Sequence, residues 1–259
     1  MILDIDAGNS RTKWRVVKNN AIFVRGISVG SDKELLESID QAIASDSSAA
    51  LDVKRLFKRV RVASVRDAKK LSALASKIQS RWQLEPEFAA TSASACGVKN
   101  SYQQPQTMGV DRWCAMVGAA SLAGRSQSFC VIDAGSAITL DLVDAQGVHL
   151  GGHIAPGFAL QLHSLLSGTD RVFVDGTAQQ MQLTPADNTS DAVLSGVLLT
   201  LCGMIEKVIQ DFNQQTATTN GPLKLFITGG DAVLLQHHLS LETHYIADLV
   251  LDGLGFLLP

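Results

Sequence analysis

Two stretches decide the fold of this chain: LDIDAGNSRTKWRVV, residues 3–17, and VIDAGSAITLDLV, residues 131–143. Each begins with a short apolar run of strand-forming residues, turns at Asp-Ala-Gly and then resumes an extended pattern, which predicts a β-hairpin. Aligning the two stretches superposes identical residues: Asp6 on Asp133, Ala7 on Ala134, Gly8 on Gly135, Thr12 on Thr139 and Val16 on Val143. Because the copies lie about half a chain length apart, we expect a duplicated fold with two similar halves.

The same succession of elements follows each hairpin. After the first copy, the pattern predicts a strand at 21–29, a helix at 34–44, a strand at 59–65, a helix at 67–82 and a strand near 84–89. After the second copy, it predicts a strand at 148–154, helices at 158–166 and 191–212, a strand at 223–228 and a short helix through 235. The fold class is therefore α/β, with two lobes of mixed sheets flanked by helices and a cleft between them. The boundary is expected near the helix at 108–123, which gives lobes 1–118 and 119–259.

Composition and charge exclude several classes of function. Of the 259 residues, 46% are hydrophobic and 18% charged, which suits one large core or two ordinary ones. The formal charge of −3 excludes a polybasic arm that binds nucleic acid. One basic cluster is interpreted as a solvated helix face and not as a nucleic-acid site: Lys54, Arg55, Lys58, Arg59 and Arg61. We expect no nucleic-acid partner.

The sequence also favours a cytoplasmic location without a membrane partner. The longest uncharged apolar stretch, Ala192 to Ile205, is shorter than the roughly 20 residues that cross a bilayer as a helix, so it predicts a buried helix. Asp4 and Asp6 stand where a signal peptide would carry positive charge. The four cysteines are widely separated and form no CxxC pair, which is typical of free thiols in a reducing compartment.

The two Asp-Ala-Gly turns suit phosphate binding. An Asp at the end of a strand, followed by small residues, presents a carboxylate beside amides that no side chain covers. Gly8 and Gly135 permit close approach of a ligand. Either turn alone is equally well interpreted as an ordinary hairpin turn. Two such turns, one in each lobe, favour a site that holds a polyphosphate from both sides. The patterns GxxxxGK[ST] and GxGxxG, which bind phosphate in other folds, are absent.

Six motifs follow one another along the chain: DAGNSRTK (6–13), NSYQQPQTMGVDRW (100–113), DAGSAITLD (133–141), GGHIAPG (151–157), NTSDAVLSG (188–196) and TGGDA (228–232). In this order the motifs resemble those of the type III pantothenate kinases, members of the acetate and sugar kinase/Hsp70/actin superfamily. Ser10 and Ser136 stand where the family usually has Thr, and both keep a hydroxyl group. The resemblance covers most of the chain and implies a duplicated ribonuclease H-like (actin-like ATPase) fold.

The resemblance also implies a reaction and a homodimer. The reaction is the ATP-dependent phosphorylation of pantothenate to 4′-phosphopantothenate, the first step of coenzyme A biosynthesis. Mg²⁺ would accompany ATP, and Asp133 would help bind a monovalent cation, K⁺ or NH₄⁺. Thr189 would reach the pantothenate site across the dimer interface.

Further site residues are implied by the same motifs. The ATP phosphates would be lined by Asp6, Ala7, Gly8, Asn9, Ser10, Arg11, Thr12, Lys13 and Ser136. Gly229 and Gly230 would lie by the adenosine. Pantothenate would be bound by Tyr102, Gly109, Val110, Asp111 and Arg112, with Asp111 as the general base.

The chemistry of phosphoryl transfer suits these residue types. A loose transition state makes little demand on the nucleophile, so Asp111 can accept the hydroxyl proton late without an elevated pKa. Arg112 offers a planar fork that matches the pantothenate carboxylate. The spacing alone is equally compatible with a surface Asp-Arg pair at the start of a helix.

Two other functions stay open. One is a regulatory protein like the Bvg accessory factors, which belong to the same family; the acids Asp6, Asp111 and Asp133 together with Arg112 argue against it. The other is a kinase or phosphatase of the same superfamily that acts on a different small molecule. Tyr102 upstream of the GVDRW segment favours pantothenate.

Overall fold

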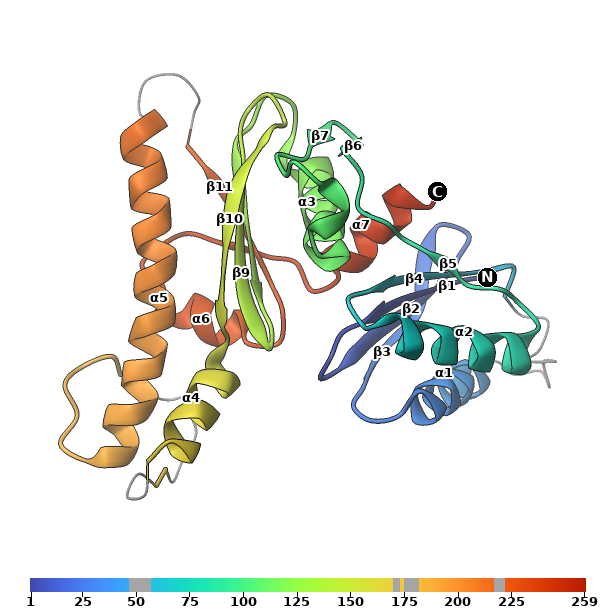
Figure 1. Ribbon diagram of the computed structural model, residues 1–259, viewed down its shortest axis with the longest axis horizontal. Coiled ribbons are helices and arrows are strands. Elements are labelled where there is room, and N and C mark those ends of the chain that lie inside the picture. The colour runs from blue at the N-terminus through green and yellow to red at the C-terminus, as the bar shows by residue number, and fades with distance from the viewer. Residues whose placement is uncertain (47–56, 170–172, 175–181, 217–221) are drawn as a thin grey trace. The chain divides into compact units, whose positions relative to one another are not determined.

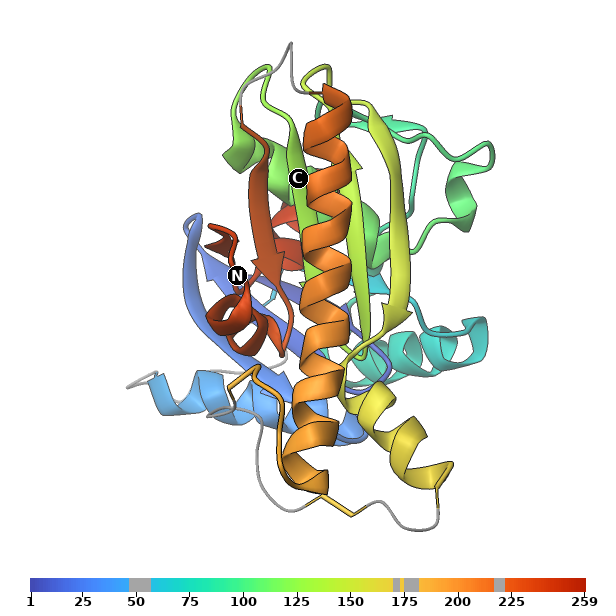
Figure 2. The same ribbon diagram turned by 90° about the vertical axis from the view of Figure 1, so that its left-hand side faces the viewer.

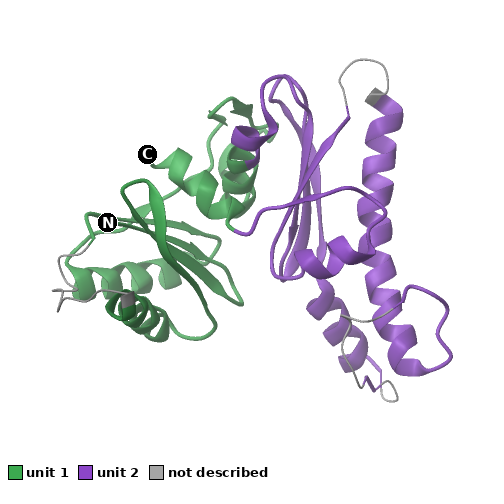
Figure 3. Cartoon of the chain, turned by 180° about the vertical axis from the view of Figure 1, so that it is seen from behind, with its two compact units in different colours: residues 1–118, 248–259 green, residues 119–247 purple. Residues whose placement is uncertain are grey.

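The computed structural model of the chain describes residues 1–46, 57–169, 173–174, 182–216 and 222–259. The chain forms two compact units, one of residues 1–118 with 248–259 and the other of residues 119–247 (Figure 3). Each unit contains one five-stranded sheet.

The first unit is built on the sheet β3-β2-β1-β4-β5 (Figure 1). Its strands are β1 (Ile2–Ala7), β2 (Thr12–Lys18), β3 (Ala21–Ser28), β4 (Arg59–Ser64) and β5 (Glu87–Phe88). The strands β1, β2 and β3 pair antiparallel, whereas β4 lies parallel to β1 and β5 parallel to β4. The predicted first hairpin is therefore confirmed. The strand expected near 84–89 is limited to the two residues of β5.

Alternation along β1 separates a core face from a polar face. Leu3, Ile5 and Ala7 are buried in a core that includes apolar residues of the helices α1 (Asp32–Asp46) and α2 (Ala68–Trp82). Because successive side chains of a strand point to opposite faces, Asp4 and Asp6 share the other face.

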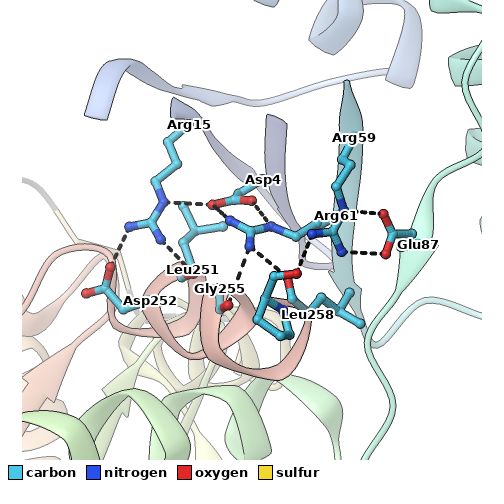
Figure 4. Close-up of polar contacts among 10 residues, drawn as sticks. Asp4, Arg15, Arg59, Arg61, Glu87, Leu251, Asp252, Gly255 and Leu258 are labelled. Atoms are coloured by element: carbon cyan, nitrogen blue, oxygen red, sulfur yellow. Dashed lines mark hydrogen bonds and ion pairs between the residues drawn. The ribbon is translucent and has the colours of Figure 1, made fainter. Parts of the chain in front are cut away.

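The polar face carries a row of buried charges. In register, Asp4 on β1 lies between Arg15 on β2 and Arg61 on β4. Asp4 is fully buried, and its carboxylate accepts hydrogen bonds from Arg15 Nε at 3.0 Å and from Arg61 Nε at 2.7 Å (Figure 4). A carboxylate buried this deeply is stable only when it is paired and hydrogen-bonded.

The last helix, α7 (Leu249–Leu257), lies on this row of charges. Arg15 donates to the carboxylate of Asp252 at 2.5 Å and to the carbonyl oxygen of Leu251 at 2.8 Å, and Arg61 donates to that of Leu258 at 2.7 Å (Figure 4). Residues 248–259 therefore belong to the first unit and not to the second lobe, where the sequence pattern had predicted them.

The interpretation of the basic cluster as a solvated helix face is wrong for two of its members. Arg59 and Arg61 lie on β4, and their guanidinium groups pair with the carboxylates of Glu87 and Asp4. Lys54 and Arg55 lie outside the described residues.

The remaining elements of the first unit lie between β5 and the point where the second unit begins, at Ala119. They are the short strands β6 (Ser94–Ala95) and β7 (Val98–Lys99), the 3₁₀-helix η2 (Pro105–Thr107) and the helix α3 (Val110–Ala123), which continues into the second unit. The helices α3 and α7 approach each other closely, because a Cβ atom added to Gly253 would lie 1.7 Å from the carbonyl oxygen of Cys114.

The second unit repeats the first, with the sheet β10-β9-β8-β11-β12. Its strands are β8 (Phe129–Ala134), β9 (Ala137–Val143), β10 (His149–Pro156), β11 (Lys224–Thr228) and β12 (His244–Tyr245). The strands β8, β9 and β10 pair antiparallel, and β11 lies parallel to β8 and to β12. Strand order and directions match those of the first sheet, so the predicted duplication is confirmed.

Three helices complete the second unit: α4 (Phe158–Ser167), α5 (Thr189–Thr216) and α6 (Ala232–His238). Figure 2 shows α5 running along one face of the sheet. By length and composition alone α5 could cross a membrane, yet 44% of its most apolar window is buried. Leu198, Leu201 and Ile205 of α5 belong to the same core as Ile132 of β8, which is what a core helix of a globular unit requires.

Candidate active site

The first Asp-Ala-Gly turn connects β1 with β2 through residues 8–11. Asp6 is half-buried and lies in register with Lys13 on β2. Ala7 and Thr12 are buried at the two strand ends. The loop residues that the sequence assigned to phosphate binding are exposed: Asn9, Ser10 and Arg11. A Cβ atom added to Gly8 would lie 2.9 Å from the carbonyl oxygen of Arg11, so the tightness of this turn requires glycine.

Two residues that the sequence analysis missed hold this turn. The hydroxyl of Ser64, at the end of β4, donates to the carbonyl oxygen of Ala7 at 2.9 Å. The guanidinium of Arg66 donates from Nε to the carbonyl oxygen of Gly8 at 3.0 Å and from Nη2 to Thr12 Oγ1 at 2.8 Å. The available signal was the position of Ser64 at the end of the strand predicted at 59–65, and of Arg66 just after it, since neighbouring parallel strands end at the same edge of a sheet.

The predicted substrate segment also folds in the first unit, and it brings Tyr102 and Arg112 together. Arg112 is only 6% exposed, and its Nη1 donates to the hydroxyl of Tyr102 at 2.9 Å. The amide of Tyr102 donates to the side-chain oxygen of Asn100 at 2.9 Å, which fixes the backbone just before it. Gly109 and Val110 precede Asp111 at the start of α3.

Asp111 lies in the first turn of α3 and is half-buried. Its carboxylate accepts a hydrogen bond from the amide of Arg112 at 2.7 Å. A Cβ atom added to Gly109 would lie 2.6 Å from Asp111 Oδ1, so glycine at 109 leaves room for the carboxylate.

The structure brings Asp6 and Asp111 near the same buried thiol. Burial raises the pKa of Cys114 above its ordinary value, and the negative charges of Asp6 and Asp111 raise that pKa further. Two acids from motifs about a hundred residues apart in the sequence thus raise the pKa of the same thiol of the first unit.

The second turn, Asp133–Ala137, lies between two other motifs of the second unit. The amide of Gly157 donates to the carbonyl oxygen of Ser136 at 3.0 Å, and that of Asp231 donates to the carbonyl oxygen of Ala134 at 2.9 Å. A Cβ atom added to Gly229, where φ is 99°, would lie 2.3 Å from the same oxygen of Ala134. Glycine is required there both by its φ angle and by the close approach.

The other predicted residues of the second unit are placed as follows. Asp133 is half-buried at the end of β8, and Ser136 is exposed. Gly229 and the exposed Gly230 directly follow β11. Thr189 is exposed at the first residue of α5.

In the residues that the structure describes, the candidate ligands for a metal ion are single carboxylates. Over the described ranges, no group of three or more His, Cys, Asp or Glu side chains could hold one. Asp6 and Asp133 each stand at the end of a strand beside small residues. This donor set does not suit a structural zinc site, but it suits a hard cation that keeps several waters or phosphate oxygens as ligands.

The chain is similar to known proteins over its whole length. A sequence model of the type III pantothenate kinase family matches residues 2–211. A type III pantothenate kinase from Pseudomonas aeruginosa (strain LESB58) is 35% identical over 262 residues, with 100% of this chain and 99% of that protein covered.

Two solved structures share the fold. A Campylobacter jejuni protein described as a conserved Baf family transcriptional activator superposes with a TM-score of 0.59 at 21% identity, covering 99% of this chain and 96% of that one. A Sinorhizobium meliloti protein described as a 2-dehydro-3-deoxygalactonokinase superposes with a TM-score of 0.54 at 14% identity, covering 99% and 98%. At these identities the likeness concerns the fold alone, and it confirms the predicted duplicated ribonuclease H-like (actin-like ATPase) fold.

Family membership follows from the sequence matches. Both the family model and the Pseudomonas aeruginosa relative span the first five motifs, up to residue 196, and the relative also spans the sixth, TGGDA. The chain belongs to the type III pantothenate kinase family.

Proposed function

We propose that this protein transfers the γ-phosphoryl group of ATP to the primary hydroxyl of pantothenate, giving 4′-phosphopantothenate in the first step of coenzyme A biosynthesis. Family membership supports the reaction class and the substrate. The observation that carries the proposal for this chain is the pairing of the buried Arg112 with Tyr102, whose hydroxyl accepts a hydrogen bond from Arg112 Nη1 at 2.9 Å, next to Asp111 at the start of α3.

In the proposed reaction, Asp111 is the general base. The pantothenate hydroxyl oxygen forms a bond to the γ-phosphorus while the bond to the β,γ-bridging oxygen of ATP breaks, and the hydroxyl proton passes to Asp111. The half-buried Asp111 can reach a ligand while α3 holds its backbone. Positioning of this kind contributes much of the rate in phosphoryl transfer.

Pantothenate is held by the residues around Asp111. Arg112 binds the pantothenate carboxylate through its planar guanidinium, which its bond to the Tyr102 hydroxyl orients. Gly109 and Val110 shape the start of α3 beside the substrate.

ATP is held by both Asp-Ala-Gly turns. Residues Asp6 to Lys13 and Ser136 line the phosphates, and Gly229 and Gly230 lie by the adenosine. Exposure of the loop residues Asn9, Ser10 and Arg11 supports their access to a ligand.

Cations complete the proposed site. Asp6 would hold Mg²⁺ through water, and Asp133 would help hold the monovalent cation, K⁺ or NH₄⁺. These ions would neutralise charge on the phosphate oxygens during transfer. The single carboxylates at the two strand ends fit this arrangement.

The protein acts as a cytoplasmic homodimer in this proposal. Thr189 is exposed and therefore accessible to the pantothenate site of a second copy. All four cysteines are free thiols, which suits a reducing compartment.

A coupled assay of ADP release tests the function. We expect release that requires pantothenate and that falls when potassium is replaced by sodium. Release driven by a sugar or acetate instead would identify a related small-molecule kinase. Absence of ATP turnover with every acceptor would favour a regulatory protein and contradict the proposal.

A further inference from the structure

We propose that Arg66 is a positioning residue for the ATP phosphate turn: together with Ser64, it orients the backbone amides of Gly8 and Asn9 toward the phosphates. This inference rests on the proposed function of that turn as an ATP site. It is carried by the three contacts of one guanidinium group, to Gly8, Thr12 and Asp32.

The contact with Gly8 determines where the next amide points. The Gly8–Asn9 peptide is trans, and the N–H and C=O of a planar trans peptide point in opposite directions. Because Arg66 Nε holds the carbonyl oxygen of Gly8 at 3.0 Å, the N–H of Asn9 points away from Arg66. On that side an amide is available to an anion.

Ser64 acts in the same way one residue earlier. Its hydroxyl holds the carbonyl oxygen of Ala7 at 2.9 Å, so the N–H of Gly8 also points away from the segment that follows β4. The same hydroxyl accepts a hydrogen bond from the amide of Arg66 at 3.2 Å, which links the two side chains. Two consecutive amides of the turn are thus oriented by two residues of one neighbouring segment, and amides fixed in advance bind an anion without a reorganisation penalty.

The Arg66 side chain is itself fixed. It is 12% exposed, and its Nη1 donates to Asp32 Oδ1 at 2.8 Å, at the start of α1. Lys77 of α2 donates to the other oxygen of Asp32 at 3.0 Å. This group holds two cations and one carboxylate, so it adds a net positive charge beside a turn that would receive phosphates.

The test compares three variants with the wild-type protein: Arg66→Gln, Arg66→Lys and Arg59→Gln. Arg59 is the matched control, because its guanidinium also holds a carboxylate, that of Glu87, and a backbone carbonyl, that of Pro259, at the opposite end of β4. Two quantities are measured: the affinity for the Mg²⁺ complex of a non-hydrolysable ATP analogue by calorimetry, without pantothenate, and KM for ATP and for pantothenate.

We expect Arg66→Gln to weaken analogue binding and raise KM for ATP by about tenfold or more, as for the loss of a hydrogen bond from a charged group, with KM for pantothenate within about twofold. Lysine cannot bridge Gly8 and Thr12 together, so Arg66→Lys is expected to stay impaired. Arg59→Gln should bind the analogue like the wild type.

Three results would overturn the inference: unchanged analogue affinity in Arg66→Gln, full recovery in Arg66→Lys, or an equal loss in Arg59→Gln. If Arg66→Gln does not fold, Ser64→Ala replaces it, and wild-type affinity in that variant counts against the inference. The proposed function fails separately, if the wild-type protein binds the analogue yet does not phosphorylate pantothenate.

Discussion

At the scale of single residues, Asp111 carries the chemical part of the proposed mechanism. Asp111→Asn keeps an oxygen that can accept the hydrogen bond from the Arg112 amide, so folding should be preserved. Removing a general base lowers turnover by about 10²–10⁴-fold. Turnover with pantothenate and the thermal unfolding midpoint, measured together, check this prediction. Near-normal turnover in a folded variant would exclude Asp111 as the base.

Asp4 is expected to dominate the stability of the first unit. Asp4→Asn leaves the guanidinium groups of Arg15 and Arg61 buried without their shared carboxylate, which should lower the free energy of unfolding by about 3–5 kcal/mol. The control is Asp211→Asn, which breaks an exposed ion pair with Lys207. This variant should change the free energy of unfolding by about 0.5 kcal/mol or less. Urea unfolding measures the free energy of unfolding of both variants. Equal losses in the two variants would show that the buried ion pairs of Asp4 do not stabilise the first unit.

The cysteines give a test of which thiols react at pH 8. Burial raises the pKa of the thiols of Cys114 and Cys130 above their ordinary value, and that of Cys202 to about 11. A raised pKa keeps a thiol neutral and unreactive at pH 8, so a thiol reagent should label only the exposed Cys96 in the native protein. Mass spectrometry before and after unfolding checks this, with Cys96→Ser as control. Rapid labelling of Cys114 in the native protein would contradict its burial.

Contacts within one motif could be predicted from the sequence, and contacts between distant residues could not. The motif around GVDRW placed Tyr102 and Arg112 in one site, and the structure joins them by a hydrogen bond. Arg15 and Asp252, which a hydrogen bond joins, are 237 residues apart in the sequence, so no local pattern predicts their contact. Arg66 was missed for the same reason, because its role depends on the parallel pairing of β1 with β4.

At the scale of elements, strands and helices with clear periodicity were predicted, whereas α7 was not. Its sequence LVLDGLGFL is apolar except for Asp252 and contains two glycines, so it shows neither helical nor strand periodicity. The helix is stabilised by tertiary contacts: its buried side chains, its close approach to α3 and the hydrogen bonds from Arg15 and Arg61.

The crossing of α3 and α7 yields a prediction at this scale. A methyl group at Gly253 meets the backbone of Cys114, which cannot yield without moving a helix, so Gly253→Ala should destabilise the protein by about 3 kcal/mol or more. Gly255→Ala in the same helix is the control. Its methyl group would lie 3.6 Å from Arg61 Nη2, an ordinary van der Waals contact, and alanine favours a helix over glycine by about 1 kcal/mol. Thermal unfolding of the two variants checks this, and equal stability would contradict the close crossing.

At the scale of the whole molecule, the duplication divides the proposed site between two units. The first unit holds Asp6 with the substrate segment, and the second holds Asp133 with the glycines after β11. The repeat of the Asp-Ala-Gly hairpin predicted correctly that Asp6 and Asp133 stand at equivalent strand ends of two similar sheets. That both turns bind one ATP molecule stays a prediction.

The most direct test of the account is the transfer of radiolabelled γ-phosphate from ATP to pantothenate, with the product identified by mass spectrometry. The wild-type protein should form labelled 4′-phosphopantothenate, whereas Asp6→Asn and Asp133→Asn should each lose at least about 10²-fold in rate while remaining folded, since each removes a charge-stabilising group. Absence of label on pantothenate, or a wild-type rate in either variant, would contradict the claim that both turns serve one phosphoryl transfer.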